Sequence, residues 1–110
     1  MSAMNKKHYF CRLVGPRATF PMDMTDEERL LMQQHAVYAL RQFAEGKLLL
    51  YGPVMAPDGP FGMGLVNAET FDEAKTSVDD DPVIKANLGF STDVFPMPRL
   101  VLPADIAASR

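Results

Sequence analysis

The sequence is poor in reactive side chains. Its 110 residues include one cysteine, two histidines and no tryptophan. A single cysteine cannot form an internal disulfide, and Cys11 lies inside the strand-like run HYFCRLV, where a buried cysteine behaves as a small hydrophobic residue rather than a nucleophile. The motifs CxxC, HExxH and GxSxG and a glycine-rich phosphate loop are absent. These absences count against zinc, nucleotide and serine-hydrolase chemistry.

Concentrated positive charge and long apolar runs are also missing. The formal net charge is -3, and the Lys and Arg residues are scattered rather than gathered in a basic stripe. Such a chain has little to neutralise a run of phosphates or an anionic membrane surface. No apolar run reaches the length of a signal-peptide core or a membrane span. We therefore expect a cytoplasmic protein that binds neither nucleic acid nor membranes.

The composition fits one folded domain. Hydrophobic residues make up 47% of the chain and charged residues 23%, as in ordinary globular proteins, and the length suits one hydrophobic core. We assign residues 1–98 to this domain. We assign residues 99–110 to a C-terminal arm. Packing of this arm on a dimer partner is the arrangement we consider for it.

Local signals divide the chain into alternating strands and helices. Thr25 and Glu28 have capping-box spacing, and Gly46 is placed to end the helix that follows. Pro96 and Pro98 place the last strand at a sheet edge or a strand end. The predicted elements are strands at 7–14, 47–52, 61–68 and 91–97, helices at 25–45 and 71–78, and a helical turn at 83–88 that stops at Gly89.

This order of elements is the split βαβ arrangement of a ferredoxin-like α+β fold with an antiparallel sheet. Its helices pack on one face of the sheet. In strand 7–14, Tyr9, Cys11 and Leu13 point one way and Phe10 and Val14 the other, so both faces are apolar. A homodimer of the dimeric α+β barrel type, in which two sheets cover each other, explains this pattern, and a higher homo-oligomer stays open.

The long helix carries His35 beside an apolar stripe. The apolar residues Met32, Ala36, Leu40 and Phe43, flanked by Val37, Ala39 and Ala44, follow helical spacing and are predicted to lie on the sheet. A histidine at the edge of such a stripe is more often a packing residue than a catalyst. A catalytic role requires a carboxylate close to the imidazole, to fix its tautomer and raise its basicity.

The segment DDDP, residues 79–82, contains the candidate carboxylates. Asp81 suits an N-cap, because Pro82 then occupies the first helical position, where its missing N–H is tolerated. In a split βαβ fold this segment runs back toward the sheet, so one of its aspartates could reach the long helix. Asp79 and Asp80 are expected to be solvated.

The chain resembles the YCII-related (YciI-like) family over roughly residues 7 to 97. The resemblance implies a ferredoxin-like homodimer with a cleft in each subunit, built around a histidine and an aspartate. Carried over, these residues are His35 and Asp81, which become the candidate catalytic pair. The segments that carry the resemblance are QQHAVYALRQFAEGKLL, LYGPV, FGMGLVNA, FDEAKTSV and DDDPVIKANL.

Four further residues are candidates for substrate binding. Arg12 lies among apolar neighbours and is expected either to bind an anion or to form a salt bridge at a rim or interface. Tyr51 can supply a phenolic donor, although filling the core is the more frequent role. Gly52 and Gly64 let a ligand approach the backbone, and a turn explains Gly52 equally well.

Two main hypotheses follow. The first is a cofactor-independent enzyme of the lyase, isomerase or hydrolase type, whose His35–Asp81 pair performs acid–base chemistry on a small metabolite. The second is a dimeric module that binds a small molecule or a protein without catalysis. A weaker alternative is a ferredoxin-like monooxygenase, either cofactor-free or with His35 as a haem ligand. The distance between His35 and Asp81 separates the first two.

Overall fold

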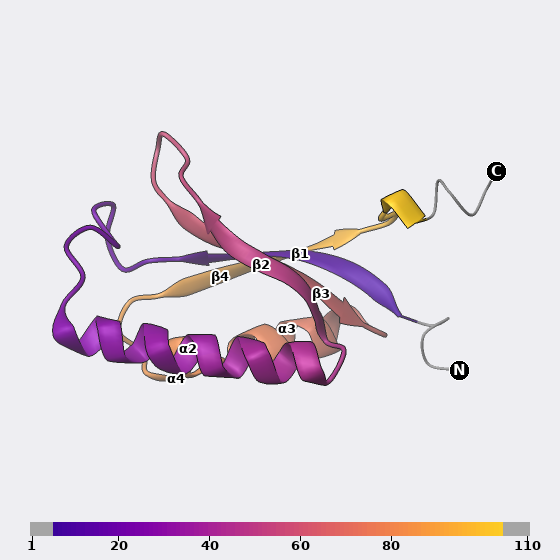
Figure 1. Cartoon of the computed structure of the whole chain (residues 1–110), viewed down its shortest axis with the longest axis horizontal. Helices are drawn as coiled ribbons and strands as arrows, with labels where there is room; N and C mark the ends of the chain where they lie inside the picture. Colours follow the sequence, from indigo (N-terminus) through magenta and orange to yellow (C-terminus); the bar gives the residue numbers. More distant parts are fainter. Residues whose placement is uncertain (1–5, 105–110) are drawn as a thin grey trace.

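The computed structural model describes residues 6–104, which form one antiparallel sheet with three helices on one of its faces (Figure 1). The strand order is β2-β3-β1-β4, so β3 separates β1 from β2, the two strands joined by the long helix. The predicted α+β class with an antiparallel sheet is confirmed. The elements are β1 (Lys7–Val14), α2 (Asp26–Ala44), β2 (Leu48–Val54), β3 (Phe61–Ala68), α3 (Phe71–Asp79), α4 (Pro82–Lys85) and β4 (Ser91–Met97).

The two longer helices begin at the predicted capping residues. The Thr25 hydroxyl accepts the Glu28 N–H at 3.1 Å, and the Glu28 carboxylate accepts the Thr25 N–H at 3.0 Å, which completes a capping box. Gly46 follows α2 with φ of 74°, a conformation that glycine adopts without strain. At α3 the Thr70 hydroxyl accepts the Glu73 N–H at 3.1 Å. Local sequence therefore determines where both helices start.

Two element ends differ from the prediction. α4 stops at Lys85 rather than at residue 88, because Asn87 takes a left-handed conformation with φ of 58°. β2 continues through Pro53 and Val54, which were expected to belong to a loop. A proline is tolerated there because β2 is an edge strand of the sheet. β4, with its two prolines at or near its end, lies at the other edge as predicted.

The core lies between the sheet and the helices. Tyr9 and Cys11 of β1 share a face as predicted, and this face is turned toward the core. The Tyr9 ring meets Phe71 of α3 edge-on at 6.1 Å between centroids. The other core members are Val66, Ala68 and Ala74. α3 packs against β1, β3 and β4, whereas α2 packs against β2 and α4. Because α3 covers the middle strands and α2 packs against the edge strand β2, space remains between α2 and the middle of the sheet.

α2 is rotated relative to its predicted orientation. Leu40 and Val37, which were expected on or beside the sheet-facing stripe, are 65% and 59% exposed. The buried face is instead about a quarter turn away and consists of Glu28, Leu31, Ala39 and Gln42. The prediction was wrong because the polar members of this face have hydrogen-bond partners from other segments, and a paired polar group can be buried.

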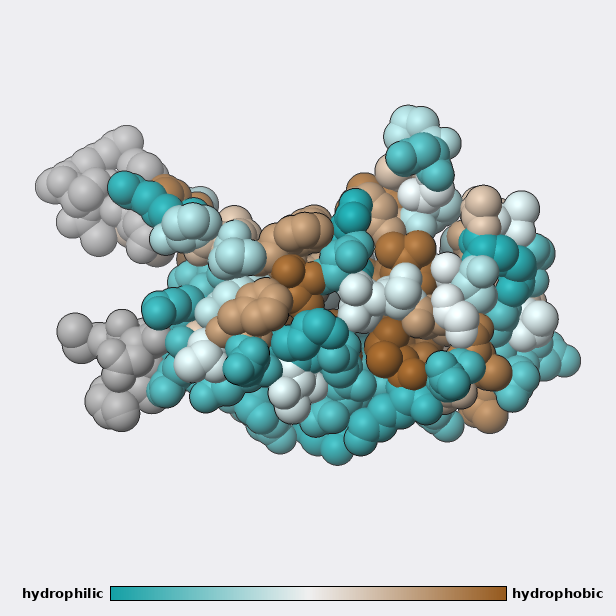
Figure 2. Space-filling model, turned by 180° about the vertical axis from the view of Figure 1, so that it is seen from behind, coloured by the Kyte–Doolittle hydropathy of each residue, from teal (hydrophilic) through white to brown (hydrophobic). Residues whose placement is uncertain are grey.

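The opposite face of the sheet carries apolar residues and one charge pair. Phe10 of β1 stacks on Phe95 of β4 with 6.3 Å between ring centroids, and Leu65 of β3 is buried on this face. Arg12 donates to Asp93 at 2.8 Å in the same region. From behind, hydrophilic side chains cover most of the helical layer, while hydrophobic patches gather higher on the same view (Figure 2).

The predicted C-terminal arm is only partly described. Residues 99–104 follow β4 and lie in the described part of the chain, whereas residues 105–110 lie outside it. Packing of this arm on a partner stays a prediction.

The loop between β1 and α2 is fixed to the start of α2 by an arginine. Arg17 donates to both carboxylate oxygens of Glu28 at 2.8 Å and also to the side chain and backbone of Asp23. Further along the loop, the Phe20 ring meets Phe90 edge-on at 5.1 Å between centroids. The loop therefore connects the helix start to the segment before β4.

The Arg17–Glu28 pair predicts a pH dependence of stability. Hydrogen bonds from Arg17 lower the pKa of Glu28 from 4.5 to about 2. A lowered carboxyl pKa stabilises the fold above the unfolded-state value, and this contribution is lost as the pH falls through the folded-state value. We expect the free energy of unfolding, measured with urea between pH 5 and pH 2, to fall more steeply in the wild type than in Glu28→Gln. Glu27→Gln, an exposed neighbour, is the control. Equal slopes for wild type and Glu28→Gln would contradict the prediction.

Candidate active site

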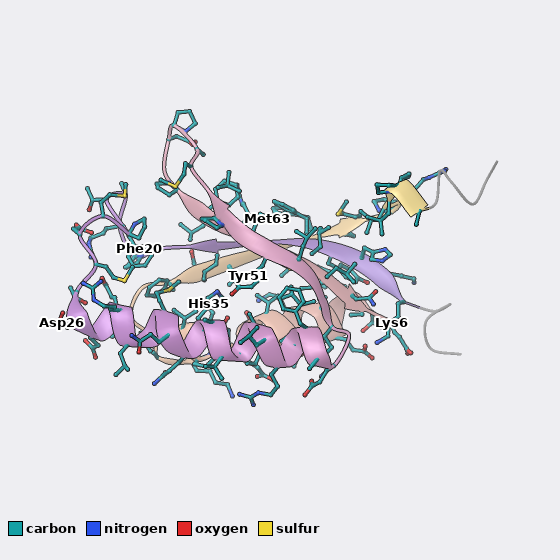
Figure 3. The ribbon with its side chains drawn as sticks, viewed as in Figure 1. Lys6, Phe20, Asp26, His35, Tyr51 and Met63 are labelled. Atoms are coloured by element: carbon teal, nitrogen blue, oxygen red, sulfur yellow. The ribbon has the colours of Figure 1, made fainter. Side chains whose placement is uncertain are left out.

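The structure brings His35 and Asp81 into contact. His35 projects from the middle of α2 toward the sheet, where Tyr51 of β2 lies across from it (Figure 3). Asp81 comes from the junction of α3 and α4, and its Oδ2 is 2.5 Å from His35 Nδ1. The two side chains are 18% and 11% exposed, so water screens this pair only in part. Residues 46 positions apart in the sequence are thus within hydrogen-bond distance.

Asp81 has two structural tasks, one for each carboxylate oxygen. Its Oδ1 accepts the Val83 N–H at 3.0 Å and so caps α4, with Pro82 at the first helical position. Val83 is fully buried and holds α4 against the rest of the fold. Oδ2 remains for His35. The cap therefore fixes the carboxylate in the orientation that the imidazole requires.

The other two aspartates of the cluster are paired with lysines. Asp79 accepts from Lys75 at 2.6 Å and from Thr92 at 3.3 Å, and it is only partly exposed. Asp80 is exposed and lies 3.7 Å from Lys85. Both were expected to be solvated: Asp80 is exposed although a lysine lies near it, whereas Asp79 is only partly exposed.

The carboxylate determines which imidazole nitrogen is free. An ionised carboxylate only accepts hydrogen bonds, so His35 Nδ1 donates to Asp81. In the neutral imidazole this places the lone pair on Nε2, where it can accept a proton. The ring of Tyr51 lies edge-on to the imidazole with 5.9 Å between centroids. The arrangement can act as a general base, and after protonation as a general acid.

A cavity of about 90 Å³ lies between α2 and the sheet, beside this pair. Its wall is mostly apolar and includes Cys11, Leu13, Leu48, Val66 and Val78. The volume is well below the ~300–1,000 Å³ of pockets for drug-sized ligands, so the cavity suits a small molecule.

Two glycines of β3 create part of this space. Gly62 and Gly64 pair with Leu13 and Cys11 of β1, so all four positions belong to the sheet face that the helices cover. A Cβ atom on Gly64 would lie 3.4 Å from a methyl carbon of Leu48, and one on Gly62 would lie 3.7 Å from the Cβ of Leu13. The missing side chains leave the strand backbone as the wall opposite α2.

Three of the four predicted substrate-binding residues border the cavity, namely Tyr51, Gly64 and Arg12. Tyr51 borders it beside His35, and Gly64 forms part of its wall. Arg12 also borders the cavity, but its guanidinium lies on the opposite face, paired with Asp93 and 5.6 Å from the centre of the Phe61 ring. Gly52 pairs with Met63 on that same opposite face and is absent from the cavity wall. Arg12 therefore forms the salt bridge that was its alternative role.

Three polar residues near the far end of the cavity were not predicted from the sequence. Gln42 of α2 is 8% exposed, and its Oε1 accepts the Ser77 hydroxyl at 2.7 Å. Tyr38 donates its hydroxyl to the Ser77 carbonyl oxygen at 2.5 Å, and burial raises its pKa. Gln42 lies seven residues after His35, a spacing that returns to the same helix face, so the sequence did contain a signal.

Cys11 does not add a nucleophile to this site. The residue is buried, and burial raises the pKa of its thiol to about 12. The thiol is therefore protonated at neutral pH and unreactive. Within residues 6–104, no three His, Cys, Asp or Glu side chains gather in a way that could hold a metal ion.

Comparison with known proteins identifies the family. The model of the YCII-related domain matches residues 9–98. The chain belongs to the YCII-related family. No curated protein matches the chain. A solved structure of an uncharacterised protein, TM1266 from Thermotoga maritima, is similar to it with a TM-score of 0.45 and 13% identity, covering 84% of this chain and 98% of that one.

The YCII-related match extends from β1 to the end of β4 and includes both His35 and Asp81. In the described part of the chain, none of the helices is long and apolar enough to cross a membrane.

Removing the charge of Asp81 should change the tautomer of His35. In Asp81→Asn one side-chain atom still accepts from Val83, but the other can donate to Nδ1, which favours a proton on Nε2. We expect long-range ¹H–¹⁵N spectra of the neutral imidazole to show more Nε2–H tautomer in this variant than in the wild type. Asp80→Asn should leave the spectrum unchanged. The same tautomer in wild type and Asp81→Asn would mean that the carboxylate does not orient the ring.

Proposed function

We propose that this YCII-related protein is a small cofactor-independent enzyme in which His35 and Asp81 perform general acid–base chemistry on a small metabolite. The observation that carries the proposal is the 2.5 Å contact between His35 Nδ1 and Asp81 Oδ2 at the wall of a small apolar cavity. A free Nε2 next to space for a ligand is what a general base requires.

The surroundings support proton transfer at this position. When Nε2 takes a proton, the Asp81 carboxylate stabilises the imidazolium through the hydrogen bond at Nδ1. The mostly apolar wall strengthens that attraction, because charges interact more strongly where water is scarce. Lyases, isomerases and many hydrolases share this step, namely removal of a proton from carbon or from water and its return to a leaving group.

Proton abstraction next to a carbonyl group provides a direct assay. The protein is incubated in D₂O with a panel of small ketones and aldehydes, and ¹H NMR follows the loss of hydrogen at the carbon beside the carbonyl. We expect the wild type to accelerate exchange of some members and His35→Gln to lose ~10²–10⁴-fold, the usual contribution of a general base. His8→Gln, the other histidine, should keep the wild-type rate. Equal rates for wild type and His35→Gln would overturn the proposal.

A non-catalytic binding module remains the second candidate, because the cap on α4 is by itself sufficient to explain the position of Asp81. It predicts ligand binding that His35→Gln weakens without any exchange in the wild type. A haem-handling monooxygenase fits less well, since a cavity of about 90 Å³ is small for a porphyrin.

We further propose that a second copy of the chain covers the open sheet face, as in a dimeric α+β barrel. Phe10, Phe95 and Leu65 make this face apolar. Arg12 and Asp93 lie side by side on it, so two copies related by a two-fold axis can place each charge near its opposite.

A charge on this face should disrupt the dimer. Phe95 is 46% exposed in the single chain, so Phe95→Glu is tolerated by the monomer but unfavourable in a covered apolar interface. Light scattering after size exclusion should give about twice the chain mass of 12.2 kDa for the wild type and about that mass for Phe95→Glu. Leu40→Glu, on the exposed side of α2, should remain dimeric. A monomeric wild type, or a dimeric Phe95→Glu, would contradict the proposal.

A further inference from the structure

The cavity beside His35 is separated from a larger groove by a layer of side chains. The groove, with a volume of about 510 Å³, lies between the C-terminal part of α2 and α3 and is lined mainly by polar and charged residues. Tyr38, Gln42 and Lys47 border both the cavity and the groove. These three residues therefore form a partition between the two spaces.

Neighbouring residues on two other elements show where the boundary runs. Along α3, Ser77 borders the groove and the following Val78 borders the cavity. Along β3, Val66 borders the cavity, and Ala68, two positions further on the same face of the strand, borders the groove. The boundary thus crosses α3 between Ser77 and Val78 and β3 between Val66 and Ala68.

Gln42 is the buried member of the partition. It is 8% exposed, whereas Tyr38 is partly buried and Lys47 is exposed. The Ser77 hydroxyl donates to Gln42 Oε1 at 2.7 Å, and the Tyr38 hydroxyl donates to the Ser77 carbonyl oxygen at 2.5 Å. These two hydrogen bonds join α2 to α3 at the boundary and hold the partition closed.

We propose that the bulk of the Gln42 side chain limits the length of the ligand, because it closes the end of the cavity remote from His35. The helical rise of 1.5 Å per residue places the two residues ~10 Å apart along α2. A cavity of ~150 Å³ holds benzene, so the volume of about 90 Å³ accommodates ~4 non-hydrogen atoms. The expected substrate is therefore short and mostly apolar. This inference rests on the function proposed above, because it assigns a substrate class to the same cavity.

The size of Gln42 and its hydrogen bond can be separated by substitution. Gln42→Met keeps a long unbranched side chain and removes the bond to Ser77. Gln42→Ala shortens the side chain to its Cβ, so the cavity opens into the groove. Alanine is favourable in a helix, and the freed Ser77 hydroxyl can bind water from the groove that it borders.

A series of straight-chain primary alcohols, from methanol to 1-octanol, measures the length limit. The hydroxyl can donate to the free Nε2 of His35, and each added methylene extends the chain along the apolar cavity. Titration of the ¹⁵N-labelled full chain gives a dissociation constant for each alcohol. In the wild type, we expect each methylene to strengthen binding about fourfold up to about the length of 1-propanol and to add no further gain beyond it.

Variants at position 42 should move this limit according to the size of the side chain. In Gln42→Ala and Gln42→Ser, we expect the gain to continue for about two further carbons, because the alcohol takes the space that the glutamine has left. Agreement between these two variants guards against a folding defect in either. Gln42→Met should keep the wild-type limit, and so should the control Gln33→Ala on the exposed side of α2.

Four results would overturn the inference. The first is the absence of saturable binding for every alcohol, and the second is an affinity that keeps rising through 1-octanol in the wild type. The third is the same length limit in the wild type and in both short variants. The fourth is a limit that moves in Gln42→Met as far as in Gln42→Ala, since the hydrogen bond rather than the bulk would then close the cavity.

The length limit is measured independently of catalysis, because the alcohols have no hydrogen beside a carbonyl group to exchange. A limit that moves with the size of residue 42, without any deuterium exchange that depends on His35, would support the role of Gln42 and reject the enzyme. Exchange that depends on His35, with a limit that stays the same in all variants, would support the enzyme and reject the role of Gln42.

Discussion

The carboxylate of Asp81 is the group on which the site depends, because one side chain connects two parts of the fold. One carboxylate oxygen accepts the backbone N–H that caps α4, and the other is hydrogen-bonded to the imidazole of His35 in α2. The cap uses a backbone N–H, whose position is set by the buried Val83. The orientation of the catalytic candidate is therefore determined by backbone geometry rather than by the freedom of an aspartate side chain.

Strand, helix and cap positions could be predicted because the signals that specify them are local. Thr25 and Glu28 are three residues apart and need no other segment to form their capping box. The rotation of α2 about its axis is not specified by local signals, because the polar face of the helix is hydrogen-bonded to Arg17, Ser77 and Asp81. Hydrophobic periodicity carries no information about partners that lie tens of residues away, and it selected Leu40 and Val37 instead.

The same distinction applies to the site. His35 and Asp81 were identified through family resemblance, and their contact spans 46 residues. Strand alternation does place Arg12 on the face opposite Cys11, but its partner Asp93 belongs to a strand that pairs with β1 only in the folded sheet. Gln42 shares the helix face of His35, which is visible in the sequence, yet the hydrogen bond that joins it to Ser77 exists only in the folded chain.

The glycines of β3 make one wall of the cavity from peptide groups. Side-chain walls adapt to different ligands by changing rotamers, whereas a strand hydrogen-bonded on both sides has little freedom to move. Gly62 and Gly64 belong to β3, which pairs with both β1 and β2. The cavity should therefore select ligands by thickness. Planar molecules can enter between the strand and the helix, whereas a branched centre of a ligand would clash with a strand backbone that has little freedom to move.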